Sequence, residues 1–210
     1  MTLSSDLIFD WCRNLNKLEM LKILLFVVFW GVSSCATAPP RDAGNLCLTF
    51  NGQAGWYGAA RQAASKWTVP VWVLMAIMHQ ESHFVADAQP PREWLLGFIP
   101  WFRPSSAYGF AQAKDETWDD YQNAAGSRWS DRDDFADAAD FIGWYCYQSH
   151  AKLGIATGDA KNLYLAYHEG WRGFQQQSHR RKSWLIKVAE KVASRAKQFQ
   201  WQLQQCPLVN

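Results

Sequence analysis

The stretch from Thr68 to Phe84 constrains the fold of this chain more than any other part of the sequence. Ten apolar residues, 69–78, run without interruption and are soon followed by Glu81. Periodicity alone does not separate a buried strand from a buried helix in so short a run. Its leucine, alanine and methionine residues favour a helix, and Pro70 suits a first helical turn, where a missing N–H costs nothing. The sequence therefore predicts a helix over residues 68–81, buried because it is apolar on all sides.

Glu81 is the candidate catalytic residue because it closes this apolar helix at the edge of the core. A carboxyl group among apolar neighbours is hard to ionise, so its pKa rises. A carboxylic acid that stays protonated near neutral pH can donate a proton to a glycosidic oxygen. The alternative is an ordinary surface glutamate at a helix end.

The rest of the chain also reads as helical, with no hairpin signal. Asp131–Asp134 place negative charge before a helix that starts near Phe135, which favours its N-terminus. Asp159 is positioned to cap another helix, which Gly170 and Gly173 end. The expected fold class is all-α, and the further predicted helices are residues 56–67, 115–124, 135–149, 160–168 and 183–204.

Residues 1–34 have the pattern of a secretory signal: lysines, an apolar run and then small residues. Met20 is an equally sensible start, so residues 1–19 are a candidate mis-assigned extension. Val32-Ser-Ser-Cys35 resembles the lipobox of bacterial lipoproteins, which implies that Cys35 carries lipid. Ala36 after this cysteine implies the outer membrane, facing the periplasm. The alternative is a plain signal anchor with a chance cysteine.

The expected organisation is a lipidated tether over residues 35–46, one domain over 47–206 and a short tail over 207–210. An oxidising periplasm permits a disulfide between Cys47 and Cys206, which flank the domain. Cys146 lies in an apolar helical segment and is expected to be a free core thiol. The net charge of +2 gives no support for nucleic-acid binding.

Residues 89–104 contain four prolines and several large apolar residues. Prolines break regular structure, and a long loop of this kind often borders a binding site. We expect this insertion to form a wall or lid over a cleft, which would favour cleavage at chain ends; an ordinary packing loop is the alternative.

Three segments together resemble a known family. His79-Gln-Glu-Ser-His-Phe84 is similar to the Glu-Ser motif of lytic transglycosylases of the soluble (SLT) type. Gly109-Phe-Ala-Gln112 is similar to their Gly-Leu-Met-Gln segment, and Ala166-Tyr-His-Glu-Gly170 to their Ala-Tyr-Asn-x-Gly segment. The resemblance covers residues 56–173. It implies a lysozyme-like α fold, peptidoglycan glycan strands as substrate and a single catalytic glutamate.

The family resemblance also implies a mechanism. Glu81 would protonate the oxygen between N-acetylmuramic acid and N-acetylglucosamine, and the substrate's N-acetyl group would stabilise the positive centre. Glu81 would then deprotonate the C6 hydroxyl, which attacks to give a 1,6-anhydro sugar. No cofactor is implied. A metal is not expected either, because His79 and His83 lack the His-Glu-x-x-His order and a third ligand.

The substrate-binding set implied by the resemblance departs from the family pattern in places. His168 stands where the family usually has asparagine, and Glu169 adds a second acid. Ser106 is chosen over Ser105 as the serine upstream of the glycine. The resemblance implies that Tyr167 lies near Glu81 and hydrogen-bonds it or the substrate. The full substrate-binding set is Ser106, Tyr108, Gly109, Gln112, Tyr167, His168 and Glu169.

Two other functions compete with this interpretation. One is a true hydrolase on the same fold, similar to goose-type lysozyme, with Asp87 or Glu169 as the partner acid. The other is a lipid-anchored domain that binds the wall without cutting it. Protein partners and the choice between endo and exo cleavage stay open.

Overall fold

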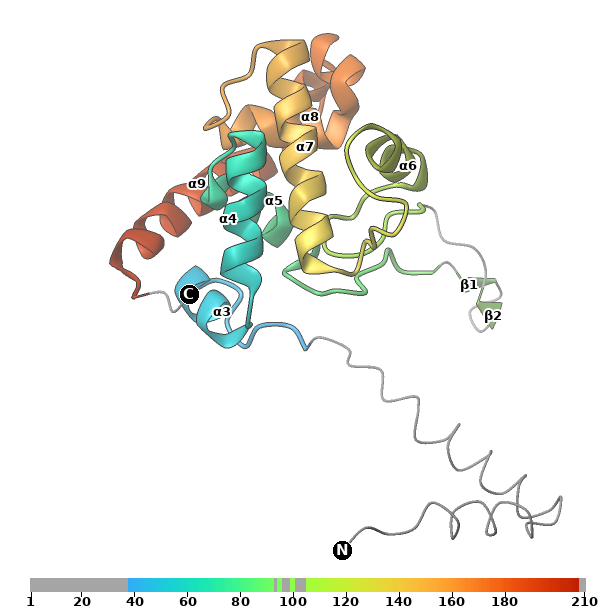
Figure 1. The fold of residues 1–210 in the computed structure, drawn as a ribbon. Coiled ribbons are helices and arrows are strands. Elements are labelled where there is room, and N and C mark those ends of the chain that lie inside the picture. Colours follow the sequence, from blue (N-terminus) through green and yellow to red (C-terminus); the bar gives the residue numbers. More distant parts are fainter. Residues whose placement is uncertain (1–37, 93, 96–98, 101–104, 208–210) are drawn as a thin grey trace, which may run out of the picture. The chain divides into compact units, whose positions relative to one another are not determined.

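The computed structural model describes residues 38–92, 94–95, 99–100 and 105–207 (Figure 1). The predicted signal segment, Cys35 and the beginning of the tether lie outside the described residues. The described part is mainly helical, as the sequence predicts. Its helices are α3 (Leu46–Gly52), α4 (Trp56–Trp67), α5 (Val71–Ser82), α6 (Asp115–Ala124), α7 (Phe135–Leu153), α8 (Ala160–Gln175), the 3₁₀ helix η1 (Ser178–Arg181) and α9 (Ser183–Gln205).

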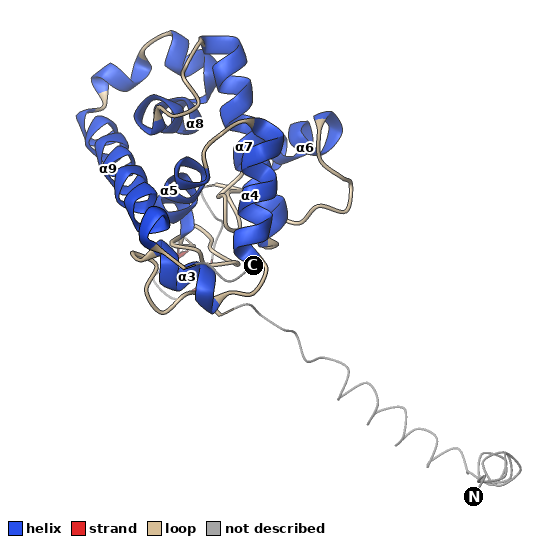
Figure 2. Cartoon of the chain, turned by 60° about the vertical axis from the view of Figure 1, so that its left-hand side comes forward, coloured by secondary structure: helices blue, strands red, loops and turns tan. Residues whose placement is uncertain are grey.

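Helix α5 is the predicted apolar helix, and it forms the centre of the core. Every residue from Val73 to Met78 is fully buried, and α5 packs against α4, α7, α8 and α9 (Figure 2). It begins at Val71, because the Thr68 backbone lies in the left-handed region and Pro70 takes an extended conformation at the N-cap. The sequence had placed its start three residues too early.

Asp140 on α7 ties three helices together. Its carboxylate accepts hydrogen bonds from Trp67 Nε1 of α4 at 2.8 Å and from Tyr121 of α6 at 2.7 Å, and Lys66 pairs with it at 2.8 Å. Helices α4 and α7 approach closely beside Gly143, where a Cβ would collide with the Trp67 ring. These contacts fix α7, which forms one side of the candidate site described below.

The end of α8 differs from the prediction. Asp159 caps its N-terminus by accepting from Asn162 N, as expected. Gly170 does not stop the helix but interrupts it, with φ 72° and ψ 161°, and a further turn and a half runs on to Gln175. The glycine therefore acts as a kink rather than a terminator, because it lets the backbone leave and re-enter helical geometry.

Three short elements were not predicted. They are α3, η1 and an antiparallel pair of two-residue strands inside the 89–104 insertion, β1 (Trp94–Leu95) and β2 (Ile99–Pro100). α3 begins at Leu46, one residue before the expected domain boundary. Each is too short to give a periodic signal in the sequence.

The two ends of the domain are joined covalently. Cys47 of α3 forms a disulfide with Cys206, which follows α9. The Gln202 side chain accepts a hydrogen bond from Leu46 N and donates one to Gly44 O. Cys146 is free and buried, and burial raises its thiol pKa. Within the described ranges, no helix has the length and apolar character needed to cross a membrane.

Candidate active site

Glu81 lies in the last turn of α5, directly after the buried run. Burial raises the pKa of its carboxyl group from 4.5 to about 7, although a hydrogen bond with Tyr164 partly opposes this effect. The C-terminal end of a helix also disfavours negative charge. The apolar helix thus produces the weak acid that the sequence predicts.

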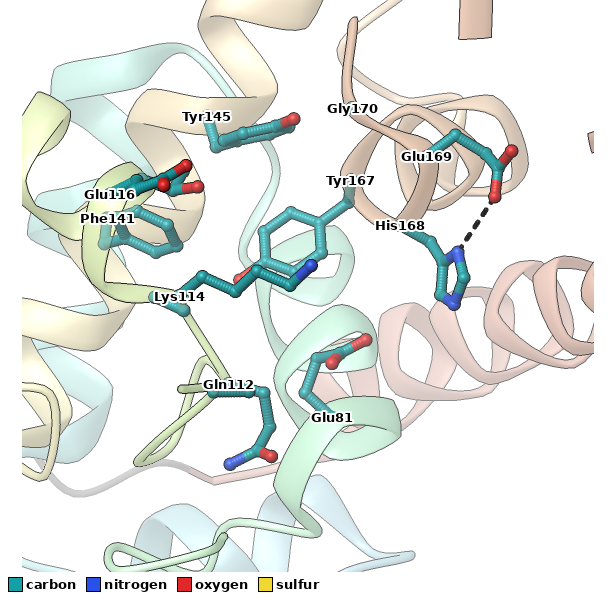
Figure 3. A pocket seen from close by; sticks show the side chains of 13 residues that line it. Glu81, Gln112, Lys114, Glu116, Phe141, Tyr145, Tyr167, His168, Glu169 and Gly170 are labelled. Atoms are coloured by element: carbon teal, nitrogen blue, oxygen red, sulfur yellow. Dashed lines mark hydrogen bonds and ion pairs between the residues drawn. The ribbon is translucent and has the colours of Figure 1, made fainter. Parts of the chain in front are cut away.

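A pocket of about 480 Å³ opens in front of Glu81. Figure 3 shows the Glu81 carboxyl projecting from α5 toward side chains of α7, α8 and the segment before α6. The pocket is lined by Glu81, Ala107, Gln112, Ala113, Lys114, Glu116, Thr117, Phe141, Tyr145, Tyr167, His168, Glu169 and Gly170.

Two tyrosines of α8 approach Glu81. Tyr164 makes the hydrogen bond with Glu81. Tyr167, one turn later, lines the pocket but donates its hydroxyl to Ala111 O at 2.6 Å. The predicted proximity of Tyr167 to Glu81 agrees with their electrostatic interaction. The hydrogen bond to Glu81, however, belongs to a residue that the sequence analysis did not select.

The Gly109–Gln112 motif builds a tight turn that carries the pocket wall. Gln112 adopts φ 48°, and its Nε2 donates to Ala88 O at 2.7 Å and Gly109 O at 2.9 Å. Gly109 adopts φ 78°, and a Cβ there would overlap the Arg132 carbonyl. A glycine is thus needed at position 109, because the Arg132 backbone leaves no room for a side chain. Gly109 does not line the pocket. Gln112 does line it, while its amide nitrogen holds the turn closed.

Ser106 and Tyr108 are also placed away from the pocket lining. The Ser106 hydroxyl accepts from Asp115 N at 3.2 Å, at the start of α6. Tyr108 donates to Asp133 at 2.9 Å, and Arg132 lies over its ring. Both hydrogen bonds hold the loop around the site. Direct contact of Ser106, Tyr108 and Gly109 with substrate stays a prediction, since none of the three lines this pocket.

His168 and Glu169 both line the pocket, but Glu169 is already committed to protein partners. Its side chain is only 3% exposed and pairs with Lys182 at 2.7 Å. It also accepts from Ser178 and contacts His168 Nδ1 at 3.2 Å. Burial would raise its pKa, but the bonds from Lys182, Ser178 and His168 outweigh burial and lower it to about 2. Glu169 is therefore ionised at neutral pH and anchors His168.

Several pocket residues carry no signal in the sequence. Lys114 extends toward the space above Glu81, and Glu116 lies across the pocket beside Phe141 (Figure 3). Tyr145 contributes from α7. Asp87, one of the two proposed partner acids, is exposed and does not line this pocket. In the described part of the chain, no group of three or more His, Cys, Asp or Glu side chains could hold a metal ion.

The fold and the pocket define a lysozyme-like α-helical domain in which a central apolar helix presents a weak acid. Residues 23–206 match the family model described as "Transglycosylase SLT domain". The chain belongs to this family, whose activity is that of a lytic transglycosylase on peptidoglycan. Comparison with curated proteins and with solved structures found no match.

Proposed function

We propose that this protein is a lytic transglycosylase that cleaves the bond between N-acetylmuramic acid and N-acetylglucosamine and leaves a 1,6-anhydro end. The observation that carries the proposal is the Glu81 carboxyl group, partly buried at the end of α5, facing the pocket and with a pKa of about 7. Near neutral pH both its protonated and its ionised forms are well populated, which suits a group that acts first as acid and then as base.

The proposed reaction uses one carboxyl group twice, first as acid and then as base. Glu81 donates its proton to the glycosidic oxygen as the C1–O bond breaks, and the substrate's N-acetyl oxygen stabilises the positive C1. Ionised Glu81 then takes the proton of the C6 hydroxyl while its oxygen bonds to C1. Glu81 ends protonated, and no water is consumed. The Tyr164 hydrogen bond favours the ionised form between the two steps.

The hydrolase alternative needs a second acid to activate water. Glu169 is poorly suited to that role, because Lys182, Ser178 and His168 occupy its carboxylate. The exposed Glu116 lines the same pocket without an ion pair in the described part of the chain. Glu116 is thus the pocket acid to replace in a test of the hydrolase alternative.

Mass spectrometry of muropeptides released from purified peptidoglycan tests the reaction. Wild type and Glu116→Gln are both expected to release anhydro products, and Glu81→Gln none. Reducing-end products from wild type that disappear in Glu116→Gln would identify a hydrolase. A folded wild-type protein that binds strands but releases nothing would instead indicate a non-catalytic wall-binding protein.

We also propose that the protein is a lipoprotein of the outer membrane, anchored through Cys35 and facing the periplasm. The support is the Val32–Cys35 motif and Ala36 after it. Cells grown with a fatty-acid analogue should label the wild-type protein and not Cys35→Ala. Equal labelling of the two proteins, or none, would exclude the anchor.

A further inference from the structure

A second groove, separate from the catalytic pocket, runs between α5 and α9. Its volume is about 740 Å³. The last two turns of α5 form one wall, and α9 forms the other with the face that carries Lys187, Lys191 and Arg195. The two helices lie side by side in Figure 2.

This groove is positively charged. Its three cations follow one another at intervals of four residues, which places them on one face of α9. None of them forms an ion pair in the part of the chain that the structure describes. Glu190 is the single acid lining the groove, and Lys161 pairs with it at 3.0 Å.

Uncharged hydrogen-bonding side chains also line the groove. Gln80, Ser194 and Gln198 line it. Burial, then Arg195 and His83, lower the pKa of His79 to about 4, so His79 is neutral at pH 7. An anionic ligand would thus meet charge from α9 and hydrogen-bond donors from both walls.

The groove lies close to the reacting group. Gln80 lines the groove and its neighbour Glu81 lines the catalytic pocket, so about one helix width, roughly 10 Å, separates the two. A second link runs along α9. Trp184, 54% exposed, contacts the ring of His168 at the pocket, with ring centroids 5.3 Å apart, and Lys187 follows Trp184 by one turn.

Peptidoglycan strands carry short peptides with free carboxylates on their muramic acid residues. An extended peptide spans about 3.3–3.6 Å per residue, so about three residues cover the roughly 10 Å from pocket to groove. We propose that the α5–α9 groove binds the carboxylate-bearing peptide attached to the sugar chain being cleaved. This inference rests on the proposed function, and adds to it that the protein prefers strands that retain their peptides.

Binding to non-reacting protein tests the inference without turnover. The full chain carrying Glu81→Gln is titrated into end-labelled soluble glycan strands, and fluorescence anisotropy gives the dissociation constant. One preparation keeps its peptides and the other has lost them to an amidase. Lys191→Glu is then added to place a negative charge in the groove. Lys197→Glu, an exposed position on the same helix outside the groove, makes the same change in net charge.

The Glu81→Gln protein is expected to bind peptide-bearing strands more tightly than stripped strands. Lys191→Glu should weaken binding to peptide-bearing strands by about fivefold, the size of a reversed surface ion pair. It should leave binding to stripped strands unchanged, and its effect should shrink as salt is added. Lys197→Glu should not change binding to either strand preparation.

Three results would overturn the inference. The first is equal binding to the two strand preparations, or none to either. The second is the same loss from Lys191→Glu and Lys197→Glu. The third is a loss from Lys191→Glu on vesicles of anionic phospholipid but not on strands, which would assign the groove to a membrane surface. The products formed by wild type decide the proposed function separately, so the two failures are distinguishable.

Discussion

Replacing Glu81 by glutamine should abolish activity and, at alkaline pH, make the protein more stable. Burial raises the pKa of Glu81 from 4.5 to about 7, net of the opposing hydrogen bond with Tyr164. This difference of about 2.5 corresponds to roughly 3 kcal/mol of free energy between the protonated and ionised forms, since one pKa unit is about 1.4 kcal/mol.

The sign of the effect follows from proton linkage. Because its pKa is higher in the folded protein, Glu81 binds its proton more tightly there than in the unfolded chain. This contribution to stability is complete below about pH 4.5, declines as pH rises and is lost above about pH 7. Glutamine does not titrate, so the variant should gain roughly 3 kcal/mol relative to wild type between about pH 4.5 and pH 8.5.

Urea denaturation of both proteins across this pH range measures the free energy of unfolding. In thermal unfolding the same change corresponds to a relative gain of about 6–12 °C for a domain of this size. Glu116→Gln makes the same substitution on an exposed side chain of the same pocket and is the matched control. A pH-independent difference in unfolding free energy between Glu81→Gln and wild type would refute the assignment of Glu81 as a weak acid shielded from water.

Three further predictions concern the surroundings of the site. Tyr164→Phe removes the hydrogen bond that lowers the pKa of Glu81, so the alkaline limb of the pH–rate profile should move to higher pH; an unchanged profile would contradict this. Gly109→Ala should lower the free energy of unfolding by about 1–3 kcal/mol in urea, because its φ of 78° and the Arg132 carbonyl both oppose a side chain. The double variant Cys47→Ala/Cys206→Ala should lose about 2–4 kcal/mol of unfolding free energy, and reduction of wild type with dithiothreitol should have the same effect. No loss in either measurement would mean that the bridge does not form.

The helices that the sequence predicted best have strong local boundaries. Trp56–Trp67 and Asp115–Ala124 were predicted to the residue, and Asp159 marked the start of α8 through its capping side chain. The predicted end of α8 was wrong because Gly170 permits a helix either to stop or to kink and continue. Only the packing of the following turn against neighbouring elements decides between the two.

Physical reasoning from neighbouring residues identified Glu81, whereas the other predicted residues that line the pocket came from the family resemblance. Glu81 could be found because its environment is the preceding apolar run. The hydrogen bonds of Ser106 and Tyr108 could not be predicted, because their partners, Asp115 and Asp133, are tertiary neighbours. Tyr164 was missed for the same reason: only the folded position of α8 brings it to Glu81.

Glu81 and Glu169, two of the acids that line the pocket, illustrate how local surroundings divide chemical roles. Both lose water on folding, which alone would raise both pKa values. Lys182 supplies a compensating charge to Glu169, which becomes a permanent anion and holds His168. Among the described residues, Glu81 is hydrogen-bonded by the neutral Tyr164 and has no ion-pair partner, so it keeps the capacity to exchange a proton near neutral pH. Burial without an ion pair in the described part of the chain is what suits Glu81 to act as the acid and base of the proposed reaction.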